Sequence, residues 1–203
     1  MRRMAGTAAM LVICLAMVMR SHGPALGKPY VDLALVLAVD VSLSMDFDEQ
    51  RLQREGYVAA FRDPKLLKAI QGGPNGRIAV TYVEWAGAGI QSVVMPWRVI
   101  AKAADAQAFA DALAEKPIRR ARMTSISGVM LGAQDLFAQS PVRGLRRVID
   151  VSGDGPNNSG SRVDEARDRL VAAGVVVNGL AIRIKSGGGA YSYFDLPDLD
   201  LYY

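Results

Sequence analysis

The 203-residue chain carries 24 basic and 20 acidic residues, and 51% of its residues are hydrophobic against 22% charged. This composition excludes intrinsic disorder and suffices for one globular core but hardly for two. Cysteine and histidine occur once each, as Cys14 and His22. The chain after residue 27 therefore has neither a Cys/His zinc site nor a catalytic set that needs either residue.

The first 27 residues have the pattern of a secretory signal peptide. Arg2 and Arg3 precede an apolar run over residues 8–19, and the tripeptide ending at Gly27 has small residues where signal peptidase reads them. The run is shorter than the roughly 20 residues of a membrane-spanning helix. We therefore expect cleavage after Gly27, a periplasmic or secreted protein, and no stable membrane insertion after cleavage, with an uncleaved anchor as the alternative.

Cleavage changes the charge of the protein. It removes three arginines and leaves 21 basic against 20 acidic residues, a net charge of +1. A net charge this small gives no global attraction to nucleic acid, so we expect no nucleic-acid partner. The oligomeric state is left open.

Residues 28–203 are predicted to form one domain in which strands alternate with helices. Val- and Ile-rich runs bounded by Gly, Pro or Asp predict strands, and apolar residues at helical spacing predict helices. In chain order these are a strand at 31–39, a helix at 47–61, strands at 78–85 and 91–97, helices at 105–115 and 125–139, a strand at 147–151, a helix at 162–173 and a strand at 175–184.

The order of these elements predicts the fold class. Alternating strands and helices favour an α/β fold: a doubly wound, mainly parallel sheet with helices on both faces. The strands at 78–85 and 91–97 are separated only by a short glycine-containing turn, which predicts one antiparallel strand at an edge. Asp46 with Glu49 three residues later predicts a capping box at the first helix.

Oxygen-bearing side chains gather where two predicted strands end. Asp40 follows the first strand, with Ser42 and Ser44 at alternate positions, and Asp154 follows a later one. Ligands of such sheets bind beyond the carboxyl ends of the strands. With Thr124 at the start of a predicted helix, the set offers two carboxylates and three hydroxyls, which suit Mg²⁺, with Mn²⁺ or Ca²⁺ as alternatives. An incoming carboxylate would complete the coordination of such an ion.

The same residues resemble the metal-ion-dependent adhesion site of von Willebrand factor type A (vWA) domains. The resemblance rests on Asp40-Val41-Ser42-Leu43-Ser44 after an apolar strand, Thr124 opening a helix, and Asp154-Gly155 after another strand. It covers nearly all of residues 28–203. Three further stretches are similar to a secreted bacterial vWA-like family of uncharacterised function (DUF1194-like): REGYVAAFRDP at 54–64, GRIAVTYVEWAG at 76–87 and RRVIDVSGDGPNN at 146–158.

The resemblance implies a Rossmann-like vWA fold and a role for each site residue. The hydroxyls of Ser42, Ser44 and Thr124 would contact the metal, and Asp40 and Asp154 would act through water. The partner would be a protein that presents an Asp or Glu to the ion. Leu43 stands where the family usually has Gly, and relatives continue beyond residue 203 through another strand and a closing helix, so we expect the C-terminus to be truncated.

The predicted function is metal-dependent, adhesion-type protein binding without catalysis. One alternative is a Mg²⁺-dependent phosphoryl-transfer enzyme of the haloacid-dehalogenase type with Asp40 as nucleophile. Such enzymes need a carboxylate two residues after the first, where this chain has Ser42. Another alternative is a metal-independent scaffold, in which Thr124 is a helix N-cap and Asp154 a turn residue.

A basic segment precedes Thr124. It consists of Lys116, Arg119, Arg120 and Arg122. It would steer an acidic partner towards the metal. A solvated, charged loop is the favoured interpretation, and steering is the alternative.

Overall fold

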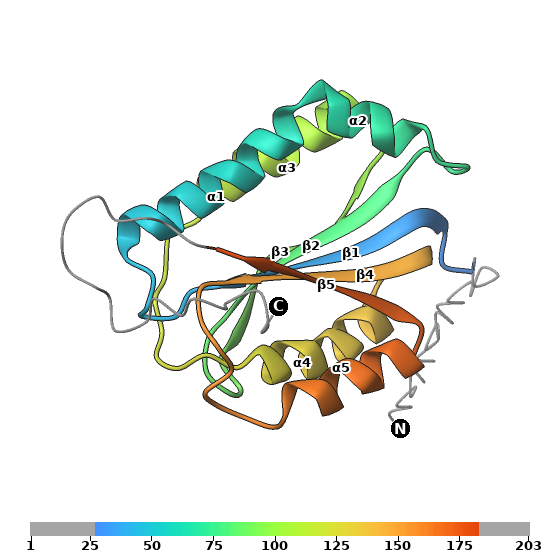
Figure 1. Ribbon diagram of the computed structural model, residues 1–203. Coiled ribbons are helices and arrows are strands. Elements are labelled where there is room, and N and C mark those ends of the chain that lie inside the picture. Colours follow the sequence, from blue (N-terminus) through green and yellow to red (C-terminus); the bar gives the residue numbers. More distant parts are fainter. Residues whose placement is uncertain (1–26, 183–203) are drawn as a thin grey trace, which may run out of the picture.

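The computed structural model describes residues 27–182, and its centre is a five-stranded sheet (Figure 1). The strands are β1 (Tyr30–Asp40), β2 (Ile78–Trp85), β3 (Gln91–Ile100), β4 (Arg143–Gly153) and β5 (Val175–Ala181). Their order across the sheet is β3-β2-β1-β4-β5. All neighbouring pairs are parallel except β2 and β3, which are antiparallel. The predicted mainly parallel sheet with one antiparallel edge strand is confirmed.

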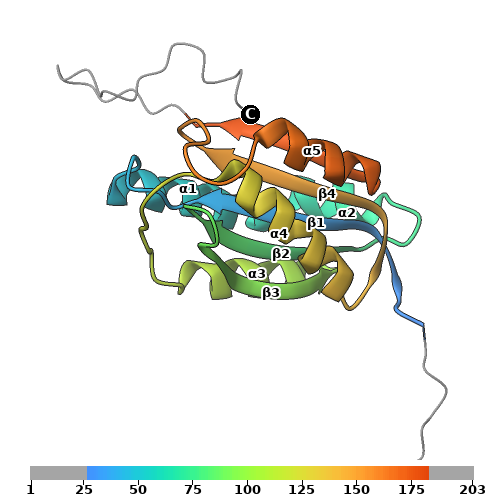
Figure 2. The ribbon, with the colours of Figure 1, turned by 90° about the horizontal axis from the view of Figure 1, so that it is seen from below.

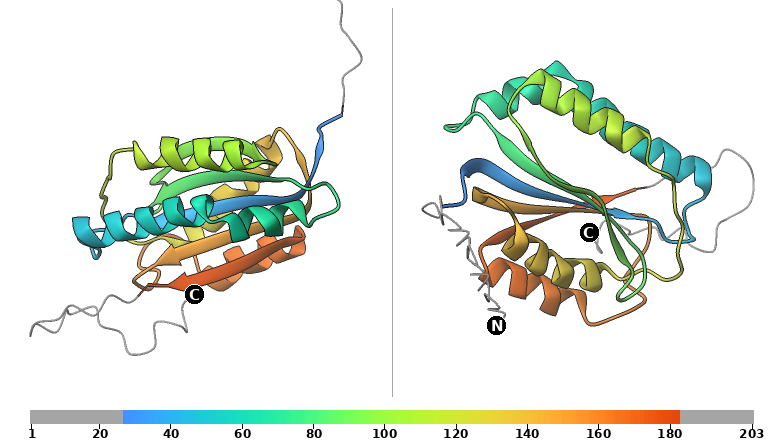
Figure 3. Two further views of the ribbon diagram at one scale, coloured as in Figure 1. Left: turned by 90° about the horizontal axis from the view of Figure 1, so that it is seen from above. Right: turned by 180° about the vertical axis from the view of Figure 1, so that it is seen from behind.

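Helices cover both faces of this sheet, as predicted. They are α1 (Phe47–Arg62), α2 (Pro64–Gln71), α3 (Ala103–Ala114), α4 (Ile126–Gln139) and α5 (Val163–Ala172). The first three lie on one face and the last two on the other (Figures 1 and 3). Figure 2, seen from below, shows α4 and α5 side by side in front of the sheet. Within the described residues, no helix has the length and apolarity needed to cross a membrane.

The central strand β1 is mostly apolar, and its carboxyl-terminal half is buried on both faces. Successive side chains of a strand point to opposite faces, so Val36 and Ala38 join the core under α4 and α5, whereas Leu37 and Val39 join the core under α1 and α3. The strand ends at Asp40, whose side chain is 0% exposed. Packing on both faces thus carries a carboxylate into the interior at the edge where β1 ends.

Several boundaries differ from the predictions, and one helix was missed. Helix α2 escaped prediction because it has only eight residues, although Asp63 caps it and Pro64 is its first residue. β4 begins at Arg143, earlier than predicted, because its polar amino end continues to pair with β1. β3 likewise continues beyond residue 97 to Ile100.

Three predictions concern residues outside the described part of the chain. The signal peptide, predicted for residues 1–27, falls almost entirely on them, as do the last two residues of the strand predicted at 175–184. The truncated C-terminus, predicted at residue 203, does as well. These remain predictions.

Candidate metal centre

A line of hydrogen bonds joins four of the five predicted ligands. The backbone N–H of Ser42 donates to Oδ1 of Asp40 at 2.7 Å. The hydroxyls of Ser42 and Ser44 are 2.8 Å apart, and Ser44 Oγ donates to Oδ1 of Asp154 at 2.7 Å. These side chains meet because β1 and β4 are parallel neighbours whose carboxyl ends lie at the same edge of the sheet.

The surroundings of Asp40 disfavour the charged form of its carboxyl group. Burial raises the pKa of its carboxyl group from 3.8 to about 7, and the negative charge of Asp154 contributes to the increase. Its Oδ2 atom is buried and has no hydrogen-bond partner among the described residues. A buried polar atom without a partner is costly. A bound cation, through a water molecule that it holds, would supply the missing partner, so the residues fit a metal ion.

Asp154 is less buried than Asp40, and the pKa of its carboxyl group is shifted in the same direction. Burial raises the pKa of its carboxyl group, while the hydrogen bond from Ser44 opposes the increase. Both carboxyl groups thus have raised pKa values without a cation. A divalent ion between them would lower both pKa values, because an opposite charge nearby stabilises the ionised form.

Thr124 reaches the same edge from the segment before α4. Ser42 forms an isolated parallel bridge with Ala121, whose N–H donates to the carbonyl of Val41 at 2.9 Å. One residue after Thr124, the N–H of Ser125 donates to the carbonyl of Ala86 at 2.7 Å. The segment that contains Thr124 therefore crosses the carboxyl ends of β1 and β2.

The N-cap of α4 is Ser125 and not Thr124. Ser125 Oγ accepts a hydrogen bond from the N–H of Gly128 at 3.1 Å, as a capping hydroxyl does. Thr124 is nevertheless buried, with 4% of its surface exposed. The interpretation of Thr124 as a helix cap is therefore wrong, and its side chain has no capping role.

Two asparagines that the sequence reasoning did not single out hold this segment. The N–H of Thr124 donates to Oδ1 of Asn158 at 2.8 Å, and the N–H of Asn158 donates back to the carbonyl of Thr124 at 2.9 Å. Asn157 Oδ1 accepts from the N–H of Ser127 at 3.1 Å. Both asparagines lie in the β4–α5 loop that also carries Asp154, so this loop positions Thr124 as well.

The backbone just before Thr124 is strained. Met123 has a φ of 71°, and it is the only non-glycine residue among those described whose φ is positive. Such a conformation costs a side-chain-bearing residue about 1 kcal/mol or more. The N–H of Gly87 donates to the carbonyl of Arg122 at 3.1 Å and holds the turn from the other side. Strain of this kind clusters at functional sites.

The sequence over residues 30–203 matches the family model described as "Protein of unknown function (DUF1194)". The chain belongs to this family. No curated protein matches the DUF1194 chain.

Solved structures show that the DUF1194 chain has a vWA-like fold. Proximal thread matrix protein 1 from the mussel byssus, with a zinc-occupied MIDAS motif, aligns with a TM-score of 0.60 and 17% identity over 77% of this chain and 39% of its own. A von Willebrand factor type A structure from Catenulispora acidiphila aligns with a TM-score of 0.52 and 16% identity over 73% of this chain and 33% of its own. This chain thus spans well under half the length of either protein.

An aerotolerance-related membrane protein from Bacteroides fragilis is also similar. It aligns with a TM-score of 0.51 and 21% identity, and the match covers 79% of this chain and 77% of that one. At these identities the likenesses concern the fold, which agrees with the Rossmann-like vWA fold that the sequence predicts.

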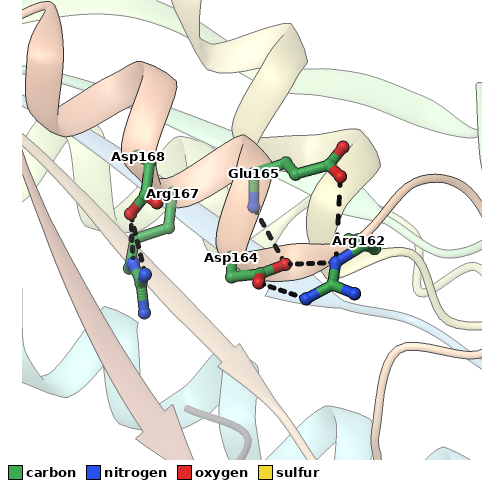
Figure 4. A network of polar contacts seen from close by, with 5 residues as sticks. All are labelled: Arg162, Asp164, Glu165, Arg167 and Asp168. Carbon is green, nitrogen blue, oxygen red and sulfur yellow. Dashed lines mark hydrogen bonds and ion pairs between the residues drawn. The ribbon is translucent and has the colours of Figure 1, made fainter.

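Other carboxylates at this edge of the DUF1194 domain have partners of their own. Asp46 and Glu49 form the predicted capping box, each accepting a hydrogen bond of 2.8 Å from the other's N–H. At the start of α5, Arg162 pairs with Asp164 and lowers the pKa of that carboxyl to about 2 (Figure 4). Across residues 27–182, no group of three or more His, Cys, Asp or Glu side chains could hold a metal. A metal site here therefore depends on hydroxyl ligands.

A buried ion pair links the elements that lie next to the candidate centre. Arg54 of α1 and Glu84 near the end of β2 form an ion pair whose side chains are 7% and 3% exposed. Arg54 also donates to the carbonyls of Leu113 and Lys116 at 3.1 and 3.2 Å. Gln50, one turn before Arg54, donates to the carbonyl of Ser42 at 3.4 Å. Helix α1 therefore links the loop of the candidate centre to the beginning of the basic segment.

Proposed function

We propose that this DUF1194 domain binds a protein partner through a divalent cation, with Mg²⁺ as the expected ion. The ligands would be Asp40, Ser42, Ser44, Thr124 and Asp154, the serines and threonine directly and the aspartates through water. The observation that carries the proposal is the buried Oδ2 of Asp40, which has no partner within the described residues although its side chain is 0% exposed. Hard oxygen ligands of this type suit Mg²⁺.

The charges of the proposed ligands favour an acidic partner. When bound, the ion would supply an electrophilic coordination position for the Asp or Glu of a partner. Only two of the five ligands are anionic, and both have raised pKa values before the ion binds. The negative charge of the ligands therefore does not exceed the ion's charge of +2. The ion stays electrophilic towards an incoming carboxylate.

The fold neighbours support a divalent ion and a binding role. The mussel byssus protein has been solved with zinc in its MIDAS motif, and a pilus adhesin, SpaC from Lactobacillus rhamnosus, shares the fold with a TM-score of 0.52 at 15% identity over 74% of this chain. We extend both properties to this domain as part of the proposal. The signal-like residues 1–27 extend it further, to a binding function in the periplasm or outside the cell.

Burial of Asp40 supports binding over catalysis. A phosphoryl-transfer nucleophile must reach the phosphorus atom of its substrate, and the Asp40 side chain is 0% exposed. The chain after residue 27 has no His or Cys to act as an alternative acid, base or nucleophile. We therefore propose that the domain has no catalytic activity of its own.

The test combines ion binding with partner capture. Isothermal titration with Mn²⁺ should show one site in the wild type, a loss of binding in Asp40→Ala and Thr124→Ala, and no change in Asp48→Ala, which removes an exposed carboxylate paired with Arg51. Capture from an envelope extract should then require Mg²⁺, and EDTA and Asp40→Ala should each abolish it. Equal ion binding by Asp40→Ala and the wild type would overturn the proposed site.

A further inference from the structure

Large apolar side chains lie close in sequence to the proposed ligands and face solvent. Leu43, which lies between two of the proposed ligands, is 46% exposed, Phe47 at the start of α1 is 59% exposed, and Met123 just before Thr124 is 52% exposed. The loops that carry them are adjacent, because Ser42 and Ala121 form a parallel bridge. We call Leu43, Phe47 and Met123 the apolar rim.

Arg120 joins the apolar rim to the basic segment. Its Nη2 donates to the carbonyl of Leu43 at 2.8 Å, and its guanidinium carbon lies 5.2 Å from the centre of the Phe47 ring. These contacts hold both residues in place, so this part of the surface is formed before any partner arrives. Preformed surfaces lose less entropy on binding.

The remaining charges of the basic segment are available to a partner. Lys116, Arg119 and Arg122 are exposed, and none forms an ion pair within residues 27–182. The charge of Arg119 does act on Glu84, because burial raises the pKa of that carboxyl group and Arg119 partly opposes the increase. Their positive charge lies next to the apolar rim along the chain. A surface that combines unpaired arginines with exposed apolar side chains is complementary to an acidic segment that also carries apolar residues.

The apolar rim is poorly explained by folding. Side chains about half exposed contribute little to the core, and Met123 is held at a φ of 71° that glycine would adopt without strain. Exposed apolar patches bordered by polar groups mark interaction sites. Leu43, Phe47 and Met123 lie beside ligands from two loops, so they would contact whatever reaches the ion.

We propose that the apolar rim and the basic segment select the residues next to the partner's carboxylate. The fitting partner is an acidic protein segment in which Leu, Ile, Phe or Met stands within two positions of the Asp or Glu. The carboxylate would go to the ion, the apolar side chain to Leu43 and Phe47, and further acidic residues to Arg119 and Arg122. This inference rests on the proposed function and deepens it.

Immobilised peptides provide the test. Each peptide carries a central Asp or Asn, flanked at one of the two positions on either side by Leu, Phe or Ser, and is probed with the full chain in Mg²⁺ or in EDTA. We expect binding only with Asp and Mg²⁺, and about tenfold stronger binding with Leu or Phe flanks than with Ser. Leu43→Ser and Phe47→Ser should reduce that preference to about twofold and keep the requirement for Asp.

The matched control is Leu52→Ser, because Leu52 lies further along α1 and is also 59% exposed. It should keep the full preference, and melting temperatures should show that all variants fold. Wild-type binding that requires Asp and Mg²⁺ but ignores the flanking residues would overturn this inference alone. Binding that does not distinguish Asp from Asn, or Mg²⁺ from EDTA, would overturn the proposed function and this inference with it.

Discussion

Ser44 and Asp154, which lie 110 residues apart in the chain, are joined by a hydrogen bond of 2.7 Å from the serine hydroxyl to the carboxylate. The contact connects the loop after β1 to the loop after β4. It depends on the parallel pairing of β1 and β4, two strands that are far apart in the sequence. Folding therefore assembles the candidate centre, and an ion bound there would in turn stabilise the fold.

The first prediction concerns this stabilisation. Millimolar Mg²⁺ or Mn²⁺ should raise the melting temperature, because an ion that binds only the folded state stabilises it by about 2.7 kcal/mol at one hundred times its dissociation constant. Thermal denaturation of Asp40→Ala and Asp154→Ala should show no increase, while Asp48→Ala should behave as the wild type. If both site variants responded to the ion as the wild type does, the ligand assignment would be wrong.

The second prediction concerns pH. Without metal, the pKa of Asp40 is about 7 in the folded protein against an ordinary value of 3.8. Between these values the folded state binds a proton that the unfolded state does not, so the contribution of Asp40 to stability falls as pH rises from 4 to 7. An ion competes with that proton, and its affinity should fall about tenfold for each pH unit below 7.

Isothermal titration with Mn²⁺ at pH 6 and pH 8 checks this effect. The affinity should be lower at pH 6. Repeating the pH 6 titration in buffers of different ionisation enthalpy should show release of about one proton per ion. Equal affinities at the two pH values would contradict the raised pKa of Asp40 or its place among the ligands.

The third prediction concerns Asn158, whose side chain accepts the N–H of Thr124 at 2.8 Å. Asn158→Ala should cost about 1–3 kcal/mol in stability, because that N–H loses its acceptor. It should also weaken Mn²⁺ binding, because Thr124 is no longer held in position. Asn158→Asp keeps an acceptor oxygen and should recover most of the binding.

Ser159→Ala is the control for Asn158. Ser159 lies in the same loop, but its hydroxyl accepts the N–H of Ala88 at 3.1 Å and not that of Thr124. It should lose stability without losing the ion. Mn²⁺ binding that Asn158→Ala leaves unchanged would remove the positioning role of this asparagine.

Strands were the features most readily predicted from this sequence, for a physical reason. β2 and most of β1 are buried on both faces, so they appear as largely apolar runs, and β2 was predicted with its observed limits at Ile78 and Trp85. β4 was predicted too short because the amino-terminal part of the strand is polar, and backbone pairing alone extends it to Arg143. Periodicity reports side-chain burial and does not report hydrogen bonding between strands.

The candidate centre also contains residues that the sequence could predict and residues that it could not. That Asp40, Ser42, Ser44 and Asp154 lie close together could be predicted, because they stand at or just after the ends of two recognisable strands. Asn158 could not, because its role is a contact with Thr124 across 34 residues. The capping role of Ser125 was also hidden, since adjacent hydroxyl residues look alike in sequence and only backbone geometry separates them.

The fourth prediction concerns Met123, whose φ of 71° suits glycine. Met123→Gly should leave the melting temperature unchanged or raise it, because relief of about 1 kcal/mol of strain offsets the greater entropy of glycine in the unfolded chain. Met123→Val should lower it, because β-branched residues tolerate this conformation least. Thermal denaturation of the two variants compares them directly, and a larger loss in Met123→Gly than in Met123→Val would contradict the strain.

The fifth prediction concerns Arg54 and Glu84. Their side chains are 7% and 3% exposed, so removing one charge leaves the other buried without a partner. Glu84→Gln should therefore cost about 3–5 kcal/mol in the free energy of unfolding measured by urea denaturation. The double variant Arg54→Met, Glu84→Leu should regain part of this loss, because an apolar pair leaves no unpaired charge in the interior.

Arg54 also anchors the carbonyls of Leu113 and Lys116, which lead into the basic segment. The double variant should thus regain only part of the stability and still show weaker partner binding, since those carbonyls lose their donor. The exposed pair of Arg62 and Asp111, at 2.7 Å between α1 and α3, is the control, and its removal should cost far less stability than Glu84→Gln, because solvent screens exposed charges. If Glu84→Gln cost as little as the loss of that exposed pair, the buried pair would not support the centre as the structure indicates.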